Sequence, residues 1–139
     1  MRVMVLVKAT EDSEAGVMPT HDELAEMGRF NEELVKAGVM LDGDGLARTS
    51  EGKRVRFEGE KTTVLDGPFA ETKELVAGYW VWEVASMEEA TEWLKRAPFR
   101  DAEVEIRRFL TAEDFGPEFT KSMQEREQAL RDEAAARHQ

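Results

Sequence analysis

Residues 75–84 are apolar on both alternate faces, and this segment constrains the fold more than any other part of the chain. One set of alternate side chains contains Trp80 and Trp82, and the other contains Tyr79 and Val81. Successive side chains of a strand point to opposite faces of the sheet, so such a strand needs cover on both sides. The segment therefore predicts a central strand.

The remaining elements follow from hydrophobic periodicity. Residues 3–7 predict a second central strand, and residues 39–46 and 103–109 predict two more. Helices are expected over residues 20–37, where Thr20 and Glu23 have capping-box spacing, and over 86–97. A loop is expected over 11–16, and a hairpin over 55–65 with Gly59 in its turn. A last helix should begin at Gly116 and fray from about residue 132.

The order of these elements is β-α-β, a hairpin insertion, β-α-β and a helical tail. It predicts an α+β, ferredoxin-like sandwich with an antiparallel sheet over residues 1–110, and a helical extension over 111–139. Both helices would pack on one face and leave Val, Leu, Tyr and Trp side chains exposed on the other. A soluble monomer rarely leaves such a patch bare. A second copy packed sheet to sheet about a two-fold axis would cover it, so we expect a homodimer. The tail helix that starts near Phe115 could be a second cover, on its own subunit or across the dimer.

Composition narrows the function classes. The net charge of -11 argues against partners such as nucleic acid and anionic membranes, which attract clustered Lys and Arg. The lack of cysteine excludes disulfides, thiolate nucleophiles and Cys-ligated zinc. With only His21 and His138 as imidazole ligands, no metal and no other cofactor is expected. We also expect no membrane span and no signal peptide, and hence a cytoplasmic protein.

Residues 66–74 read Asp-Gly-Pro-Phe-Ala-Glu-Thr-Lys-Glu and precede a Gly-Tyr-Trp run at 78–80. This pattern resembles the hallmark of the YCII-related proteins, in the subgroup named for its DGPF motif. Residues 28–38, 43–46 and 112–116 also resemble that subgroup, so the likeness covers about residues 2–120. The resemblance implies a dimeric α/β-barrel in bacterial cytoplasmic proteins, often encoded beside extracytoplasmic-function sigma factors.

The resemblance implies no particular reaction. The broader superfamily includes muconolactone isomerases, chlorite dismutases and small monooxygenases. Some YCII proteins carry a His–Asp pair proposed as catalytic, and His21 lies near the corresponding place. The residues around His21 do not match that pattern, however. Residues 98–101, the loop after the second predicted helix, contain no histidine either, which argues against a histidine-based mechanism.

Asp66 and Lys73 are the predicted catalytic residues. Asp66 precedes a Gly-Pro pair that stiffens the chain, and a stiff loop can hold a carboxylate as a general base. Alternatively, Asp66 accepts hydrogen bonds from backbone amides and stabilises its own turn. Lys73 could steady a developing negative charge, or it could form a surface ion pair with a neighbour such as Glu71.

The predicted substrate-binding residues are Arg29, Asp44, Phe69, Glu71 and Tyr79. Arg29 interrupts the apolar stripe of the first helix, where it could bind a carboxylate ligand or pair with an acidic neighbour. Asp44 lies between two glycines and could face the same cavity. Tyr79 is either a core residue or part of a pocket wall.

Two functions remain open from the sequence. In the first, the protein binds a small molecule, acidic ones included, beside residues 66–74 and performs metal-free acid/base chemistry on it, as an isomerase, hydrolase or cofactor-free oxygenase. In the second, it is a non-catalytic regulatory or interaction module, and the resemblance suggests a link to an extracytoplasmic-function sigma factor.

Overall fold

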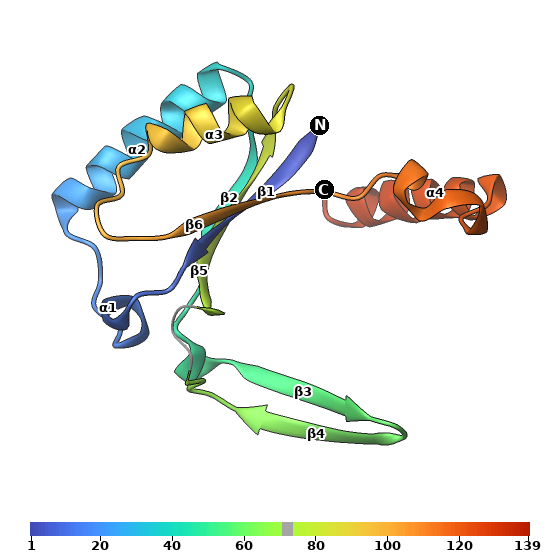
Figure 1. Ribbon diagram of the computed structural model, residues 1–139, viewed down its shortest axis with the longest axis horizontal. Helices are drawn as coiled ribbons and strands as arrows, with labels where there is room; N and C mark the ends of the chain where they lie inside the picture. Colours follow the sequence, from blue (N-terminus) through green and yellow to red (C-terminus); the bar gives the residue numbers. More distant parts are fainter. Residues whose placement is uncertain (71–73) are drawn as a thin grey trace. The chain divides into compact units, whose positions relative to one another are not determined.

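The computed structural model describes residues 1–70 and 74–139 in two units, Met1–Arg108 and Phe109–Gln139. The first unit contains a four-stranded sheet in the order β2-β5-β1-β6. Its strands are β1 (Arg2–Lys8), β2 (Met40–Gly45), β5 (Val76–Glu83) and β6 (Val104–Arg108), and every neighbouring pair is antiparallel. β1 and β5 occupy the centre (Figure 1), so the prediction from their two-sided apolar patterns is confirmed.

Two helices, α2 (His21–Lys36) and α3 (Met87–Lys95), lie on the same side of this sheet (Figure 1). α2 buries Phe30 and Leu34 against Val5 and Trp82 of the central strands, and α3 adds Ala90. Val5, Leu34, Trp82 and Ala90 are 0% exposed. The core of the first unit therefore lies between these two helices and one face of the sheet.

The other alternate side chains of the central strands point away from this core. Met4 lies opposite Val81 and Leu6 lies opposite Tyr79, and all four are half-buried. We call the side of the sheet formed by Met4, Leu6, Tyr79 and Val81 the open face. The sequence predicted that both helices would pack on one face of the sheet, and α2 and α3 do so. The open face is the opposite face.

The helix ends follow local sequence signals. The Thr20 side chain accepts a hydrogen bond from the Glu23 amide, and the Glu23 carboxylate accepts one from the Thr20 amide, as their capping-box spacing predicted. Gly38 follows α2 at φ +72°, where a residue without Cβ is favoured. Residues 11–16 were expected to be a loop, but Glu11–Glu14 form the short helix α1 because Thr10 and Ser13 also make a capping box.

A hairpin inserted between β2 and β5 forms its own two-stranded sheet. It consists of β3 (Lys53–Glu58) and β4 (Lys61–Asp66), and a single 3-10 turn, η1 (Thr49–Glu51), precedes it. The hairpin is longer than the expected 55–65, and Gly59 at φ +63° makes its turn. Asp66 is consequently the last residue of β4 and pairs with Lys53, the first residue of β3.

The second unit contains η3 (Ala112–Glu118) and α4 (Lys121–Arg137). The prediction that Gly116 begins the last helix is wrong, because Gly116 has a non-helical φ of +71° and α4 starts after Thr120, whose side chain accepts from the Met123 amide. α4 continues to Arg137, past residue 132, from which fraying was expected. Ion pairs at i,i+4 spacing support it there, such as Arg137 with Glu133 at 3.1 Å.

Candidate functional site

Three connecting segments meet at one end of the four-stranded sheet. β1 and β2 both run antiparallel to β5, so their C-terminal ends lie beside the start of β5. The Ala9 amide donates to the Leu75 carbonyl and the Leu46 amide donates to the Ala77 carbonyl, each at 2.8 Å. α1 follows β1, η1 follows β2, and residues 67–75 precede β5. The sheet topology therefore gathers the DGPF segment, residues 66–69, with α1 and η1.

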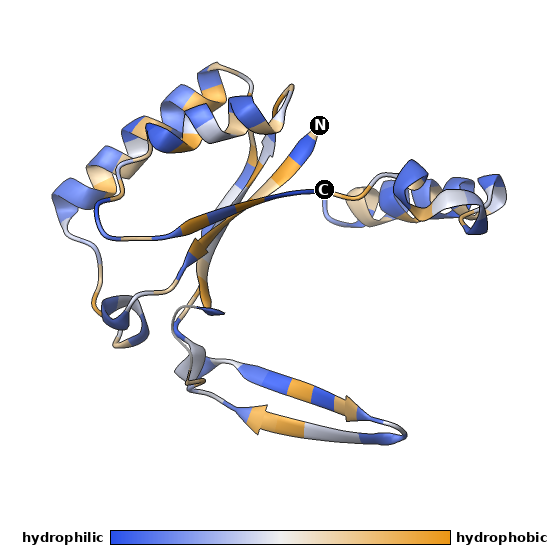
Figure 2. Ribbon diagram, viewed as in Figure 1, coloured by the Kyte–Doolittle hydropathy of each residue, from blue (hydrophilic) through white to orange (hydrophobic). Residues whose placement is uncertain are grey.

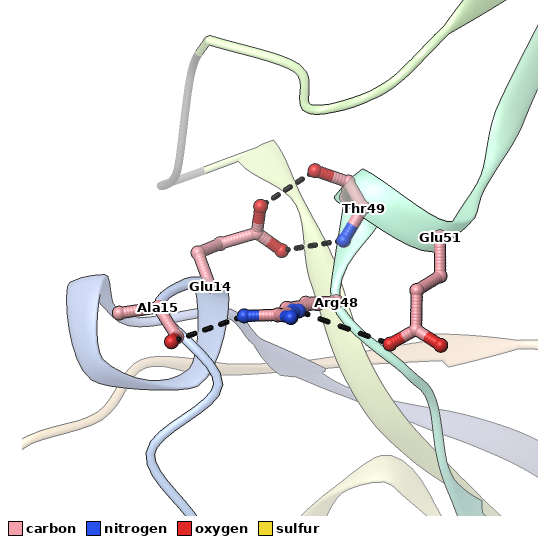
Figure 3. A network of polar contacts seen from close by, with 5 residues as sticks. All are labelled: Glu14, Ala15, Arg48, Thr49 and Glu51. Atoms are coloured by element: carbon pink, nitrogen blue, oxygen red, sulfur yellow. Dashed lines mark hydrogen bonds and ion pairs between the residues drawn. The ribbon is translucent and has the colours of Figure 1, made fainter.

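Thr49 joins these three segments, and Figure 3 shows its bonds to Glu14 of α1. Its amide donates to Oε1 of Glu14 at 3.1 Å, and its hydroxyl donates to Oε2 of Glu14 at 2.5 Å. The same hydroxyl oxygen accepts from the Phe69 amide at 3.1 Å. Arg48 adds a bond from its guanidinium to the Ala15 carbonyl at 3.2 Å. One threonine thus connects α1 and η1 to the DGPF segment.

Gly67 has no room for a side chain. Its amide donates to the Gly52 carbonyl at 3.1 Å, which presses the DGPF segment against η1. A Cβ on Gly67 would lie 1.7 Å from the Thr49 carbonyl oxygen and 2.6 Å from the Thr49 carbonyl carbon. The glycine of this motif is therefore required by backbone-to-backbone contact.

Asp66 and Phe69 both contact side chains of β3. Asp66 forms an ion pair with Lys53, and both side chains are largely exposed. The guanidinium of Arg54 lies 3.9 Å from the centre of the Phe69 ring, a cation–π contact. Glu71 and Lys73, which the sequence also proposed for the site, lie outside the described residues.

A one-residue bulge places two carboxylates on the open face. Met40 lies opposite Trp82 on the core side, and without the bulge Asp42 would lie on that side too. Leu41 is the extra residue, so Asp42 pairs with Val81 and Asp44 pairs with Tyr79. A one-residue shift of register reverses the face of every following side chain. The bulge therefore brings Asp42 and Asp44 to the same face as Tyr79.

Tyr79 interacts with both carboxylates. Its hydroxyl donates to Oδ2 of Asp42 at 3.4 Å. The negative charge of Asp42, followed by desolvation and the charge of Asp44, raises the pKa of Tyr79 above its ordinary value. The phenol is therefore held protonated as a hydrogen-bond donor, beside two carboxylates that can accept. This group can hold a polar ligand edge or exchange a proton with it.

Arg29 lies in a different part of the molecule. It is exposed on α2, where it lines a groove of about 250 Å³ with Phe30, Glu33 and Arg96. Arg96 is paired with Glu33 at 2.5 Å. The groove belongs to the helical layer, whereas Tyr79 and Asp44 point to the opposite side of the sheet. The sequence-derived set thus divides among the open face, the DGPF segment and the helical groove.

Sequence reasoning missed Asp42, Glu14 and Thr49. The position of Asp42 could have been predicted. In a regular strand Asp42 would share the core face with Met40, but the Asp-Gly-Asp-Gly run from 42 to 45 does not continue an apolar face. That conflict of alternation indicates a bulge. Glu14 and Thr49 are 35 residues apart and match no local motif.

Over residues 1–70 and 74–139, no group of three or more His, Cys, Asp or Glu side chains has an arrangement that could hold a metal ion. Within the same ranges, no helix has the length and apolar character needed to cross a membrane.

Comparisons with known proteins identify the family. A protein of Rhizobium meliloti (strain 1021), named only as uncharacterized, is 31% identical over 72 residues. This chain covers 58% of the length of that relative, and the match spans 52% of this chain. A solved structure of 5-chloro-2-hydroxyhydroquinone dehydrochlorinase (TftG) from Burkholderia phenoliruptrix AC1100, in complex with 2,5-dihydroxybenzoquinone, superposes with a TM-score of 0.44 and 18% identity. That superposition covers 79% of this chain and 94% of the other. The family model of the YCII-related domain matches residues 1–112, so this chain belongs to the YCII-related family.

Proposed function

We propose that this protein is a homodimer that binds a small, uncharged, hydrogen-bonding molecule on the open face, next to the DGPF segment. The observation that carries the proposal is the group formed by Tyr79, Asp42 and Asp44, which borders the half-buried Leu6 and Val81. Small-molecule sites combine apolar walls with a few convergent polar groups, and this face offers both.

A second copy is needed to close the site. Within the first unit, α2 and α3 pack on the other side of the sheet and leave the open face without a covering layer. We propose a ferredoxin-like protomer and a sheet-to-sheet dimer, a dimeric α/β-barrel, in which two open faces enclose the ligand. A stable interface buries roughly 800 Å² per partner, and at about 25 cal/mol per Å² its apolar half contributes roughly 10 kcal/mol per partner before the cost of association is subtracted.

The charges near Tyr79 favour an uncharged ligand over an acidic one. Asp42 and Asp44 would repel an anion, and among the described residues no Lys or Arg lies within ion-pair distance of either. A neutral hydroxyl or carbonyl group can instead accept from the Tyr79 phenol or donate to a carboxylate. Asp66 would act as a base only if the ligand displaced Lys53 from it.

A thermal-shift screen tests this function. Wild type and the variants Tyr79→Phe, Asp66→Asn and Arg29→Gln are screened against neutral phenols, lactones and diols, with small acids as a second set. At 100 times its Kd a ligand stabilises a protein by about 2.7 kcal/mol. We expect neutral compounds to raise the Tm of wild type and of Arg29→Gln, and to shift Tyr79→Phe much less.

Two results would contradict the proposal. If Arg29→Gln abolishes the shift and Tyr79→Phe does not, the ligand occupies the helical groove. If no compound shifts wild type, the site is not a ligand site of this kind, and a regulatory or interaction module without chemistry becomes the better reading.

A further inference from the structure

The hairpin β3–β4 presents an apolar face of its own. The register places Val55 opposite Val64 and Phe57 opposite Thr62 on the same side of the ribbon. Val55 is 53% exposed, Val64 is 62% exposed and Phe57 is 74% exposed. Figure 2 shows the apolar segments of both strands on this hairpin. We call the side formed by Val55, Phe57 and Val64 the hairpin patch.

The contacts of the hairpin with its own chain lie on the opposite side. Arg54 alternates with Val55 along β3, and its guanidinium packs on the Phe69 ring. Leu65, which pairs with Arg54, is half-buried. The base is held by the bonds from Gly67 to Gly52 and from Phe69 to Thr49. The DGPF segment therefore covers the Arg54 side and leaves the hairpin patch exposed.

A two-stranded ribbon of this kind needs cover. An isolated hairpin is marginally stable in water, and an exposed apolar patch on it favours association. In Figure 1 the hairpin extends away from α2 and α3, on the side of the open face. A second copy seated on that face would therefore meet the hairpin.

Charge also favours a second copy as the occupant. The hairpin, residues 53–66, carries four cationic side chains and three acidic ones, a net charge of +1 in a chain whose net charge is -11. The cations are Lys53, Arg54, Arg56 and Lys61. The β2 edge of the open face carries Asp42 and Asp44 without a described basic neighbour. The hairpin is more basic than the chain as a whole, and the acidic β2 edge of a second copy is complementary to it.

We infer that the hairpin is a dimer arm: the hairpin patch of each protomer packs on the partner's open face, and the partner's Phe57 forms part of the wall of the ligand chamber. This inference rests on the dimer proposed above. Each chamber would then be incomplete in a single chain, because part of its apolar wall comes from the other copy. Aromatic side chains are frequent anchors of interfaces since they bury a large area with few rotatable bonds.

Photo-crosslinking tests the arm directly, because the chain contains no cysteine. A benzophenone maleimide is attached to Phe57→Cys, and separately to the matched control Arg56→Cys, the adjacent residue on the opposite side of β3. Labelled protein is mixed with an isotope-labelled copy, irradiated and analysed by peptide mass spectrometry. We expect Phe57→Cys to crosslink to residues 2–8 or 76–83 of the other copy, and Arg56→Cys not to.

Sedimentation separates the two proposals. We expect Phe57→Thr to raise the dimer Kd at least tenfold, and Arg56→Thr to change it by less than about threefold, with both variants folded by circular dichroism. If wild type is a dimer but Phe57→Cys crosslinks only within its own chain or to the helical layer, the arm is wrong and the sheet-to-sheet dimer stands. If wild type is a monomer at high concentration, both are wrong.

Discussion

Replacing Gly67 by alanine gives the sharpest test of how the DGPF segment is held. The added Cβ would lie 1.7 Å from the Thr49 carbonyl oxygen, and the neighbour is backbone, which cannot rotate away. Non-bonded carbon and oxygen atoms need more than 3 Å, so the segment must move by more than 1 Å relative to η1. Such a movement breaks the bonds from Gly67 to Gly52 and from Phe69 to Thr49, which are both 3.1 Å long.

The magnitude follows from those two hydrogen bonds. Each contributes about 0.5–1.5 kcal/mol, so the docked segment loses about 1–3 kcal/mol. Each 1.4 kcal/mol is a factor of ten, so opening becomes roughly 5- to 150-fold more frequent. The described core cluster of the first unit contains no residue of this segment, so we expect the global free energy of unfolding to change much less.

Amide hydrogen exchange measures this effect at Phe69, with Gly52→Ala as the matched control. A Cβ on Gly52 would meet the same Thr49 carbonyl oxygen at an ordinary 3.5 Å. Exchange at Phe69 should accelerate in Gly67→Ala and stay close to wild type in Gly52→Ala. Equal protection in wild type and Gly67→Ala would show that the segment is not docked on Thr49.

Three further predictions test other parts of the structure. Leu34→Ala should lower the free energy of unfolding in urea by about 2–5 kcal/mol, because Leu34 is 0% exposed, and a loss below about 1 kcal/mol would contradict this core. Thr49→Val should accelerate exchange at Phe69, since it removes the hydroxyl that pairs with Oε2 of Glu14 and accepts from the Phe69 amide, whereas Thr49→Ser should not. Tyr79 is the single tyrosine, so ultraviolet titration of its phenolate should give a pKa above 10.0 that falls in Asp42→Asn. Because the pKa of Tyr79 is raised on folding, its contribution to stability is complete below pH about 10 and is lost as pH rises through the folded-state pKa. A titration midpoint of Tyr79 at its ordinary pKa would contradict the Tyr79–Asp42 contact.

Local patterns were sufficient for most of the elements of the first unit. The central position of β1 and β5 could be read from apolar side chains on both alternate faces, because only strands covered on two sides tolerate them. The start of α2 could be read from Thr20 and Glu23, which satisfy each other's amides within one turn. The start of α4 could have been read in the same way from Thr120, had the Gly-Pro pair at 116–117 not been given more weight.

The candidate site could not be read in this way. Tyr79, Asp44 and Phe69 were selected by their residue types and motif, yet Asp42 joins Tyr79 only because Leu41 bulges out of β2. Glu14 holds the DGPF segment through Thr49 across 35 residues. Arg29, which shares neither contact, lies on the helical layer.

The chain by itself determined most of the helices and strands of the first unit and which strands lie at the centre, because those choices depend on side-chain spacing over a few residues. Only the tertiary structure decided which side chains meet, as in the contacts of Tyr79 with Asp42 and of Thr49 with Phe69. Strand register and the contact of distant backbone segments are set by the packing of the whole sheet, and a shift of one residue would have turned both carboxylates toward the core.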